Sequence, residues 1–140
     1  MLIIFSSPEP EEEATEKIRK QKLFDFIWAY SATMTKQSVS TTGTCQYRQP
    51  SETPGEAVNK CFIGATLPNR IYRKKMDTEV LSVVDILGSY PNVAEHYEAK
   101  GFTTNVDFLY ELQDIHDSYF ESRKNLLRVL AKDYGLNVPA

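Results

Sequence analysis

The side chains with the widest chemical range in this sequence are two cysteines and two histidines. Cys45 and Cys61 lie near the two ends of the polar stretch TCQYRQPSETPGEAVNKCFIG, and the histidines are His96 and His116. Two Cys and two His can hold zinc tetrahedrally. Zinc modules, however, bring their ligands in close pairs such as C-x-x-C, whereas 15 residues separate these cysteines and 19 separate these histidines. The four residues are therefore an alternative metal site, and the primary expectation is a protein without a metal or other cofactor.

We favour packing in a core as the role of both cysteines, because free cysteine is among the most buried residue types. Two cysteines are too few for a disulfide scaffold. A catalytic alternative combines Cys61 as nucleophile with His116 as base and Asp114 or Asp117 as the orienting group. No sequence signature surrounds these residues. We expect His116, which falls on the apolar stripe of a predicted helix, to anchor that helix through a hydrogen bond.

A basic turn, NRIYRKK, is the second candidate site. It places Arg70, Arg73, Lys74 and Lys75 within six residues, with Tyr72 among them. Basic residues interleaved with an aromatic can bind phosphates and stack on bases. On an acidic protein such a cluster is more often a solvated loop or a surface that meets an acidic protein. The chain has no GxGxxG or Walker motif for nucleotides.

Composition limits the class of protein. The 140 residues predict a single domain, 1–140, and 41% apolar with 25% charged residues are typical of a globular protein. A net charge of -3 disfavours the wrapping of duplex DNA, because such domains are normally basic. The apolar run MLIIF is too short for a signal peptide or a membrane span. We therefore expect a cytoplasmic protein without membrane contact, in a bacterium or in a cell that hosts a virus.

Apolar spacing and turn residues predict four to five helices. The first spans about 11–34, overlaps the end of an N-terminal extension (1–13) with a cap at Ser6 or Ser7, and is acidic in its first turn. Its expected stripe is Ile18, Leu23, Ile27, Tyr30 and Met34, with further apolar surface at Phe24, Phe26 and Trp28. A second helix is expected over 77–87, capped by Asp77 with Val80, Val83, Val84 and Leu87 inward, and a third over 92–100, ended by Gly101. A fourth is expected to be capped by Thr104 and Asp107, with Leu109, Leu112, His116 and Tyr119 inward. The last is expected to be capped by Ser122, with Leu126, Leu127, Leu130 and Tyr134 inward and a Schellman motif at Gly135 as its end.

Two stretches predict a β-hairpin. TCQYR alternates with Cys45 and Tyr47 on one face, and KCFIGATL does so with Cys61, Ile63 and Ala65. The connection QPSETPGEAVN carries two prolines and a glycine, so we expect an exposed tip. MLIIF is either a third strand or an apolar tail. The predicted fold is α+β: a small antiparallel hairpin or three-stranded sheet packed against four to five helices.

Four short motifs follow one another along about 23–136: C-x-Y-R, K-C-F-I-G-x-x-x-P-x-x-x-Y, L-Q-x-I-H-D and L-x-x-L-A-x-x-Y-G-L. Together they resemble a group of small, uncharacterised proteins encoded by bacteriophages and prophages. Asn69 stands where that group has an acidic residue, the tip is longer, and the segment MLIIFSSPEPEEE is not part of the pattern. The resemblance implies an infected bacterial cell and little about activity. The positions that it carries over are Cys45, Tyr47, Arg48, Lys60, Cys61, Gly64, Pro68, Tyr72, His116 and Asp117.

We expect a binding protein rather than an enzyme. Small acidic phage proteins without catalytic signatures often act by occupying a surface of another protein, and inhibition of a host or defence protein is one such action. The partner would be a host or phage protein in the host cytoplasm. A Cys/His-dependent or metal-dependent enzyme, and nucleic-acid binding through the turn 70–75, are the alternatives. The candidate binding residues are Arg48, Arg70, Tyr72, Arg73, Lys74 and Lys75, with the tip Pro50–Asn59, because interfaces favour Arg and aromatic residues.

Overall fold

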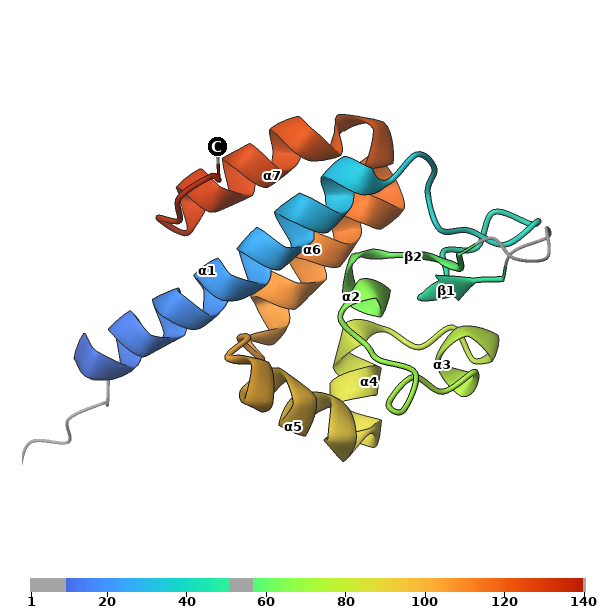
Figure 1. The fold of residues 1–140 in the computed structure, drawn as a ribbon, viewed down its shortest axis with the longest axis horizontal. Coiled ribbons are helices and arrows are strands. Elements are labelled where there is room, and N and C mark those ends of the chain that lie inside the picture. Colours follow the sequence, from blue (N-terminus) through green and yellow to red (C-terminus); the bar gives the residue numbers. More distant parts are fainter. Residues whose placement is uncertain (1–9, 51–56, 140) are drawn as a thin grey trace, which may run out of the picture.

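The fold combines helices with a very small sheet. A computed structural model describes residues 10–50 and 57–139, and among these it has five helices longer than one turn beside one antiparallel pair of strands (Figure 1). This confirms the predicted α+β class. The elements are α1 (Pro10–Thr33), β1 (Arg48–Gln49), β2 (Asn59–Lys60), α2 (Phe62–Ala65), α3 (Lys75–Thr78), α4 (Val83–Ser89), α5 (Pro91–Lys100), α6 (Val106–Tyr119), the 3-10 turn η1 (Phe120–Ser122) and α7 (Arg123–Asp133).

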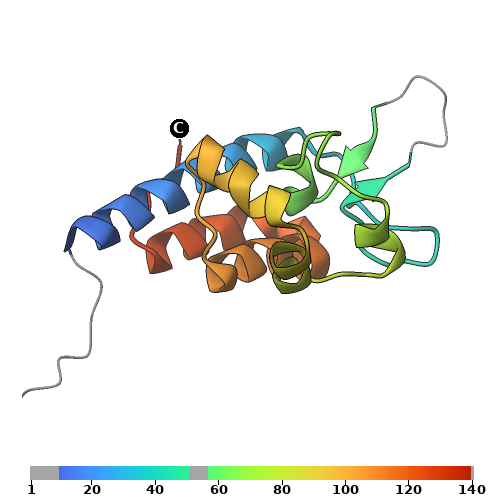
Figure 2. The same cartoon turned by 90° about the horizontal axis from the view of Figure 1, so that it is seen from below.

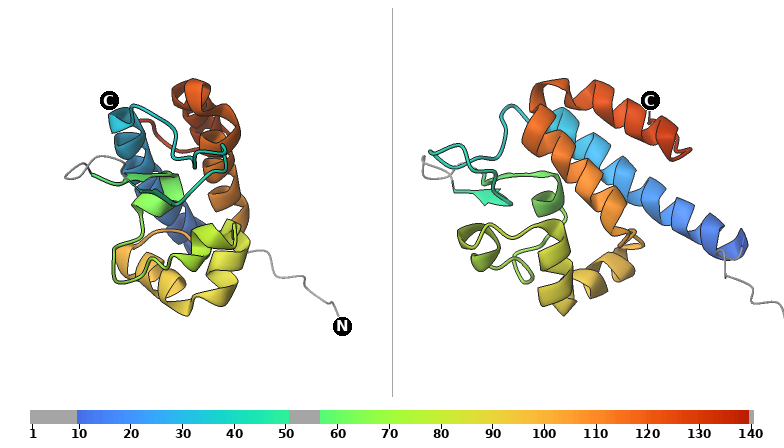
Figure 3. Two further views of the ribbon diagram at one scale, coloured as in Figure 1. Left: turned by 90° about the vertical axis from the view of Figure 1, so that its right-hand side faces the viewer. Right: turned by 180° about the vertical axis from the view of Figure 1, so that it is seen from behind.

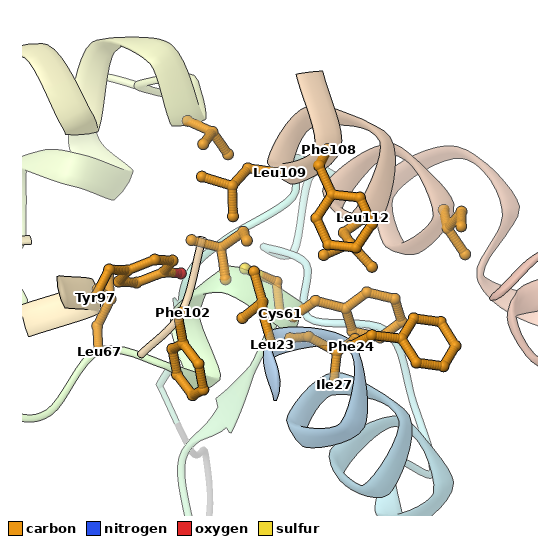
Figure 4. Close-up of a cluster of buried hydrophobic side chains, with 14 of the residues drawn as sticks. Leu23, Phe24, Ile27, Cys61, Leu67, Tyr97, Phe102, Phe108, Leu109 and Leu112 are labelled. Atoms are coloured by element: carbon orange, nitrogen blue, oxygen red, sulfur yellow. The ribbon is translucent and has the colours of Figure 1, made fainter. Parts of the chain in front are cut away.

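Helices α1, α6 and α7 make up one half of the structure. The last of them, α7, packs against both α1 and α6, and the short α2 contacts the same two helices (Figure 1). In the other half, α4 packs on α6 and on α5. The strands and α3 lie at the end of the molecule remote from the start of α1 (Figures 1 and 2). Buried apolar side chains from both halves form one cluster; those labelled in Figure 4 are Leu23, Phe24, Ile27, Cys61, Leu67, Tyr97, Phe102, Phe108, Leu109 and Leu112.

The expected apolar stripe of α1 is confirmed in its second half only. Leu23 and Ile27 are fully buried and Met34 nearly so, whereas Ile18 is 58% exposed. Ile18 precedes Leu23 by five residues, which is about 140° around a helix. It therefore lies on the side of α1 away from the core. Phe26, at 39% exposure, covers only the edge of the core, with its ring 5.7 Å from that of Phe102.

The predicted hairpin is far shorter than expected. The strands pair Arg48 with Lys60 and Gln49 with Asn59, and the chain turns into α2 directly after Lys60. The prediction of a strand across 60–67 was wrong because a run of apolar residues fits a buried helix as well as a strand. Cys45 makes an isolated bridge with Val39 instead of belonging to β1.

The single helix expected over 77–87 is split in two. It ends at Thr78, and α4 begins after Ser82, whose hydroxyl accepts from the Asp85 N–H while the Asp85 carboxylate accepts from the Ser82 N–H. This capping box begins a separate helix, α4, that does not continue α3. Val83 is buried as predicted, whereas Val80 and Val84 are 64% and 52% exposed. Asp77, the expected helix cap, lies inside α3 instead, and its carboxylate accepts hydrogen bonds from the backbone of Tyr47 and Arg48.

The remaining helices form where predicted, with changes at their caps. Gly101 ends α5 with φ of 72°, and Gly135 ends α7 in a Schellman motif whose bonds run from the N–H of Gly135 and Leu136 to Lys132 and Ala131. Asn105, and not Thr104, caps α6 by accepting from the Phe108 N–H. Ser122 precedes α7 without a capping bond from its side chain. Tyr119, expected inward, is 56% exposed.

Several expectations fall on residues outside the described ranges. They are the strand or tail 1–5, the cap at Ser6 or Ser7, and residues 51–56 of the tip. Residues 10–13 of the expected extension form the first turn of α1. No helix within 10–50 and 57–139 is long and apolar enough to cross a membrane.

Candidate functional site

Cys61 occupies a structural position at the start of α2. Its Sγ accepts a hydrogen bond of 3.2 Å from the Gly64 N–H, and its side chain is fully buried among core residues (Figure 4). Burial raises the pKa of the Cys61 thiol. Because the thiolate is the nucleophile and the metal ligand, this environment favours capping and packing over chemistry.

His116 is held by both of its ring nitrogens. The Ser38 backbone N–H lies 3.1 Å from Nε2, and Nδ1 lies 2.7 Å from Asp117 Oδ1. A backbone N–H can only donate, so Nε2 accepts and the ring proton sits on Nδ1, which donates to Asp117. The side chain is fully buried. No lone pair of the ring remains for a thiol proton. The bond from Ser38 anchors α6 to the chain after α1.

Cys45 lies beside this pair. Its Sγ is 3.7 Å from Gln37 Nε2 and 3.8 Å from the Asp117 carbonyl oxygen. Burial, reinforced by the negative charge of Asp117, raises the pKa of the Cys45 thiol to about 12. It is therefore a neutral thiol at physiological pH, while Gln37 also donates to the carbonyl oxygens of His116 and Asp117.

The structure gathers only part of the proposed metal set. Within the described residues, one group of candidate ligands has its donor atoms within 4.8 Å of one another: Cys45, His116 and Asp117. Cys61 and His96 lie outside it. A metal at Nδ1 would require the proton on Nε2, which would then face the Ser38 N–H, donor against donor. The hydrogen bonds of His116 therefore do not fit a metal at this group in this arrangement.

His96 is part of the α2–α5 contact. Its Nε2 donates to the Thr66 carbonyl oxygen at 3.0 Å, and Nδ1 lies 3.5 Å from an amino group of Arg70. Burial lowers the pKa of His96, and the charge of Arg70 acts in the same direction. The histidine therefore anchors the start of the basic turn, which is a structural role.

Asp77 joins the basic turn to β1. Its two carboxylate oxygens accept from the backbone N–H groups of Tyr47, at 2.6 Å, and Arg48, at 3.1 Å, and also from the Tyr72 hydroxyl. The Arg48 guanidinium lies 4.4 Å from the centre of the Tyr72 ring and donates to Asn69 Oδ1 and to the Leu67 carbonyl oxygen. Tyr72 and Arg48 are thus held rigidly. Four exposed basic residues lie close to Tyr72 in sequence: Arg70, Arg73, Lys74 and Lys75.

A hollow of about 320 Å³ opens at this point. Its lining includes Pro50, Val58 and Tyr72 as apolar surface and Arg48 and Lys74 as cationic groups. Val58 is 42% exposed, so a partner can reach the apolar part. We call the hollow and the four exposed basic residues the basic hollow. Three of the six predicted binding residues, Arg48, Tyr72 and Lys74, line the hollow itself. The other three, Arg70, Arg73 and Lys75, are exposed neighbours in the same turn.

Sequence reasoning missed the residues that position these groups. Asp77 was predicted to be a helix cap, and nothing local reveals that its carboxylate binds a strand 30 residues earlier. Gln37 and Ser38, which hold the His116 pair, lie in a stretch predicted only as loop. The one available signal was Ser82 followed by Asp85, a capping-box pattern that would have revealed the break before α4.

Comparison with known proteins identifies no relative for this chain. No protein-family model, no curated protein and no solved structure matches it.

Proposed function

We propose that the chain is a small phage-type protein that acts by binding another protein through the basic hollow, as an inhibitor of a host or defence protein. The observation that carries the proposal is a rigid Arg–Tyr pair in an apolar hollow that Lys74 also lines, next to further exposed basic residues of the same turn. Arg and Tyr dominate binding energy at interfaces, partly because a held side chain loses little entropy on binding. The partner would present an apolar side chain next to carboxylates.

The geometry favours a protein partner over a nucleic acid. Stacking on bases needs an accessible aromatic face. Tyr72 is half-buried, its hydroxyl is bound to Asp77, and one face of its ring carries the Arg48 guanidinium. The exposed cations alone would support only salt-dependent phosphate contacts.

The test is capture of a partner from bacterial lysate by the immobilised protein. A double reversal, Arg73→Glu with Lys74→Glu, should weaken capture without lowering the melting temperature, because both side chains are exposed. A matched control reverses Lys124 and Arg128, one lysine and one arginine exposed on α7. Capture that survives the first double variant, or that only the α7 variant removes, would refute the basic hollow as the site. An affinity whose logarithm falls linearly with log salt for added oligonucleotides would instead indicate nucleic acid.

A further inference from the structure

Charge is divided unevenly along this chain. Residues 76–122 contain ten Asp and Glu residues and a single Lys, Lys100, out of the 19 acidic and 16 basic residues of the whole sequence. The segment comprises α4, α5 and α6. On α4 and α6 no Lys or Arg occurs, and within the described residues none of their carboxylates pairs with a Lys or Arg elsewhere. Two of these carboxylates, Asp114 and Asp117 on α6, line one cleft.

Exposed apolar side chains also line this cleft. Val80 precedes α4 with 64% exposure, and Tyr110 on α6 has 59% exposure. Both line a cleft of about 290 Å³ between α6, the α3–α4 turn and residues 44–47. Figure 3 shows α4 beside α6 from behind, and the two helices are in contact. Val84, in the first turn of α4, adds a third large exposed side chain.

The cleft also has carboxylates in its lining. Asp114 and Asp117 both line it, together with the neutral thiol of Cys45. Asp114 accepts one hydrogen bond from the Ser118 hydroxyl. One oxygen of Asp117 accepts from His116 and Gln113. The cleft thus offers carboxylate oxygens beside apolar walls.

Val80 is held in an unfavourable backbone conformation. Its φ is 51°, the left-handed region that a β-branched residue rarely adopts. The turn is a Schellman motif, with bonds from the N–H of Val80 and Leu81 to Asp77 and Met76, and glycine is the usual residue there. The valine side chain is exposed, so core packing does not account for it.

We propose that the cleft and its apolar rim, Val80, Val84 and Tyr110, dock a segment of a second protein that presents an arginine or lysine next to a large aliphatic side chain. The carboxylates of Asp114 and Asp117 select the cation, and the apolar rim selects the aliphatic group. The cleft adjoins the basic hollow, because Gln46 lines both, and it differs from the hollow in the charge that it presents. This inference does not depend on the proposed function of the hollow.

The experiment uses three capped tetrapeptide amides of alternating sequence: Leu-Arg-Leu-Arg, Gly-Arg-Gly-Arg and Leu-Glu-Leu-Glu. Each is titrated into the 15N-labelled full chain, and amide shifts are followed by NMR. We expect the Leu-Arg peptide to bind, with shifts concentrated in 80–84 and 110–118. The Gly-Arg peptide should bind at least about fivefold more weakly, and the Leu-Glu peptide not measurably. Equal binding of the Leu-Arg and Leu-Glu peptides, or shifts concentrated elsewhere, overturns the proposal.

Single substitutions at the cleft test the same site. Val80→Gly should weaken binding of the Leu-Arg peptide while the melting temperature stays equal or rises, because glycine removes the strained conformation along with the contact. Asp114→Asn and Tyr110→Ala should each weaken binding at least about fivefold. The controls are Glu12→Gln on α1 and Val129→Ala on α7, which remove an exposed carboxylate and an exposed valine elsewhere. Controls that weaken binding as much as the rim variants overturn the site.

A second copy of this chain is the competing occupant, because its own basic turn carries exposed arginine and lysine. Sedimentation velocity at increasing concentration separates the cases. A monomer at all concentrations supports a different partner protein. Self-association that Tyr110→Ala abolishes would assign the cleft to a second copy and overturn the proposal.

Discussion

Gly64 offers the sharpest test of the packing. It lies in α2, with ordinary helical backbone, and a Cβ built on it would be 2.0 Å from the carbonyl oxygen of Tyr47 and 2.7 Å from the carbonyl carbon. Real Cβ atoms essentially never come within 3.0 Å of another heavy atom, so α2 and residue 47 would have to separate by about 1 Å. Neither is free to move, because α2 lies against α1 and α6, and the Tyr47 N–H is bound to Asp77.

The expected cost follows from that geometry. Overpacking a core costs about 1–3 kcal/mol and occasionally more. The obstacle here is main chain on a segment held from both sides, so we place Gly64→Ala at about 3 kcal/mol or above. The gain in helix propensity from Gly to Ala, about 0.5–1 kcal/mol, offsets only a part. For a domain of this size, 3 kcal/mol corresponds to a fall in melting temperature of roughly 6–12 °C.

Urea unfolding followed by circular dichroism measures this directly. The matched control is Gly88→Ala in α4, where nothing lies within 4 Å of the added Cβ. We expect the control to stabilise the protein by about 0.5 kcal/mol through helix propensity alone. A free energy of unfolding of Gly64→Ala within about 1 kcal/mol of the wild type would show that α2 does not approach Tyr47 as described.

Three further predictions concern charged and ionisable groups. The raised pKa of Cys45 should make its alkylation in the native protein on the order of a hundredfold slower than in the urea-denatured chain at the same pH. Equal alkylation rates in the native and denatured protein would contradict the raised pKa. Asn69→Asp should stabilise the protein by about 0.5–1 kcal/mol, measured by urea unfolding, because the new carboxylate would meet the Arg48 guanidinium, and high salt should reduce the gain. The lowered pKa of His96 means that protonation favours the unfolded state, so the free energy of unfolding should fall as the pH drops below the ordinary histidine value of 6.5. The substitution His96→Gln should reduce this pH dependence. An unchanged dependence of the free energy on pH would show that another group causes it.

Some elements of this fold follow from local sequence. The long α1, with its acidic first turn, and the ends of α5 and α7 at Gly101 and Gly135 form where predicted. Each depends on contacts within a few residues: a side chain and the nearest backbone groups, or a glycine that adopts positive φ without strain. Burial of Leu127 and Leu130 on α7 follows from the same helical spacing.

The candidate sites were only partly predictable. Tyr72 and its basic neighbours could be identified as a cluster from their spacing alone. Their arrangement could not be predicted, because it depends on the contact of Tyr72 with Arg48 and on the bond from Asp77 to the backbone of Tyr47, both of which join parts of the chain that are far apart in sequence. The acidic cleft escaped prediction for a related reason: Val80 was assigned to the inner face of a continuous helix, and the break before α4 turned it outward.

Residues 61–65 show where local sequence stops being sufficient. The apolar run after Lys60 is compatible with a strand or a helix, and a helix of four residues has no stability of its own in water. Tertiary contacts decide for the helix: the Ile63 N–H donates to Gln113 on α6, and Gly64 allows the backbone of Tyr47 to approach. Composition and local spacing determined a small α+β fold with most of its helices, and predicted core packing correctly for Cys61 but not for the partly exposed Cys45. Only the folded chain determined which short segment became α2 and which side chains surround each site, because those choices depend on partners that are far apart in sequence.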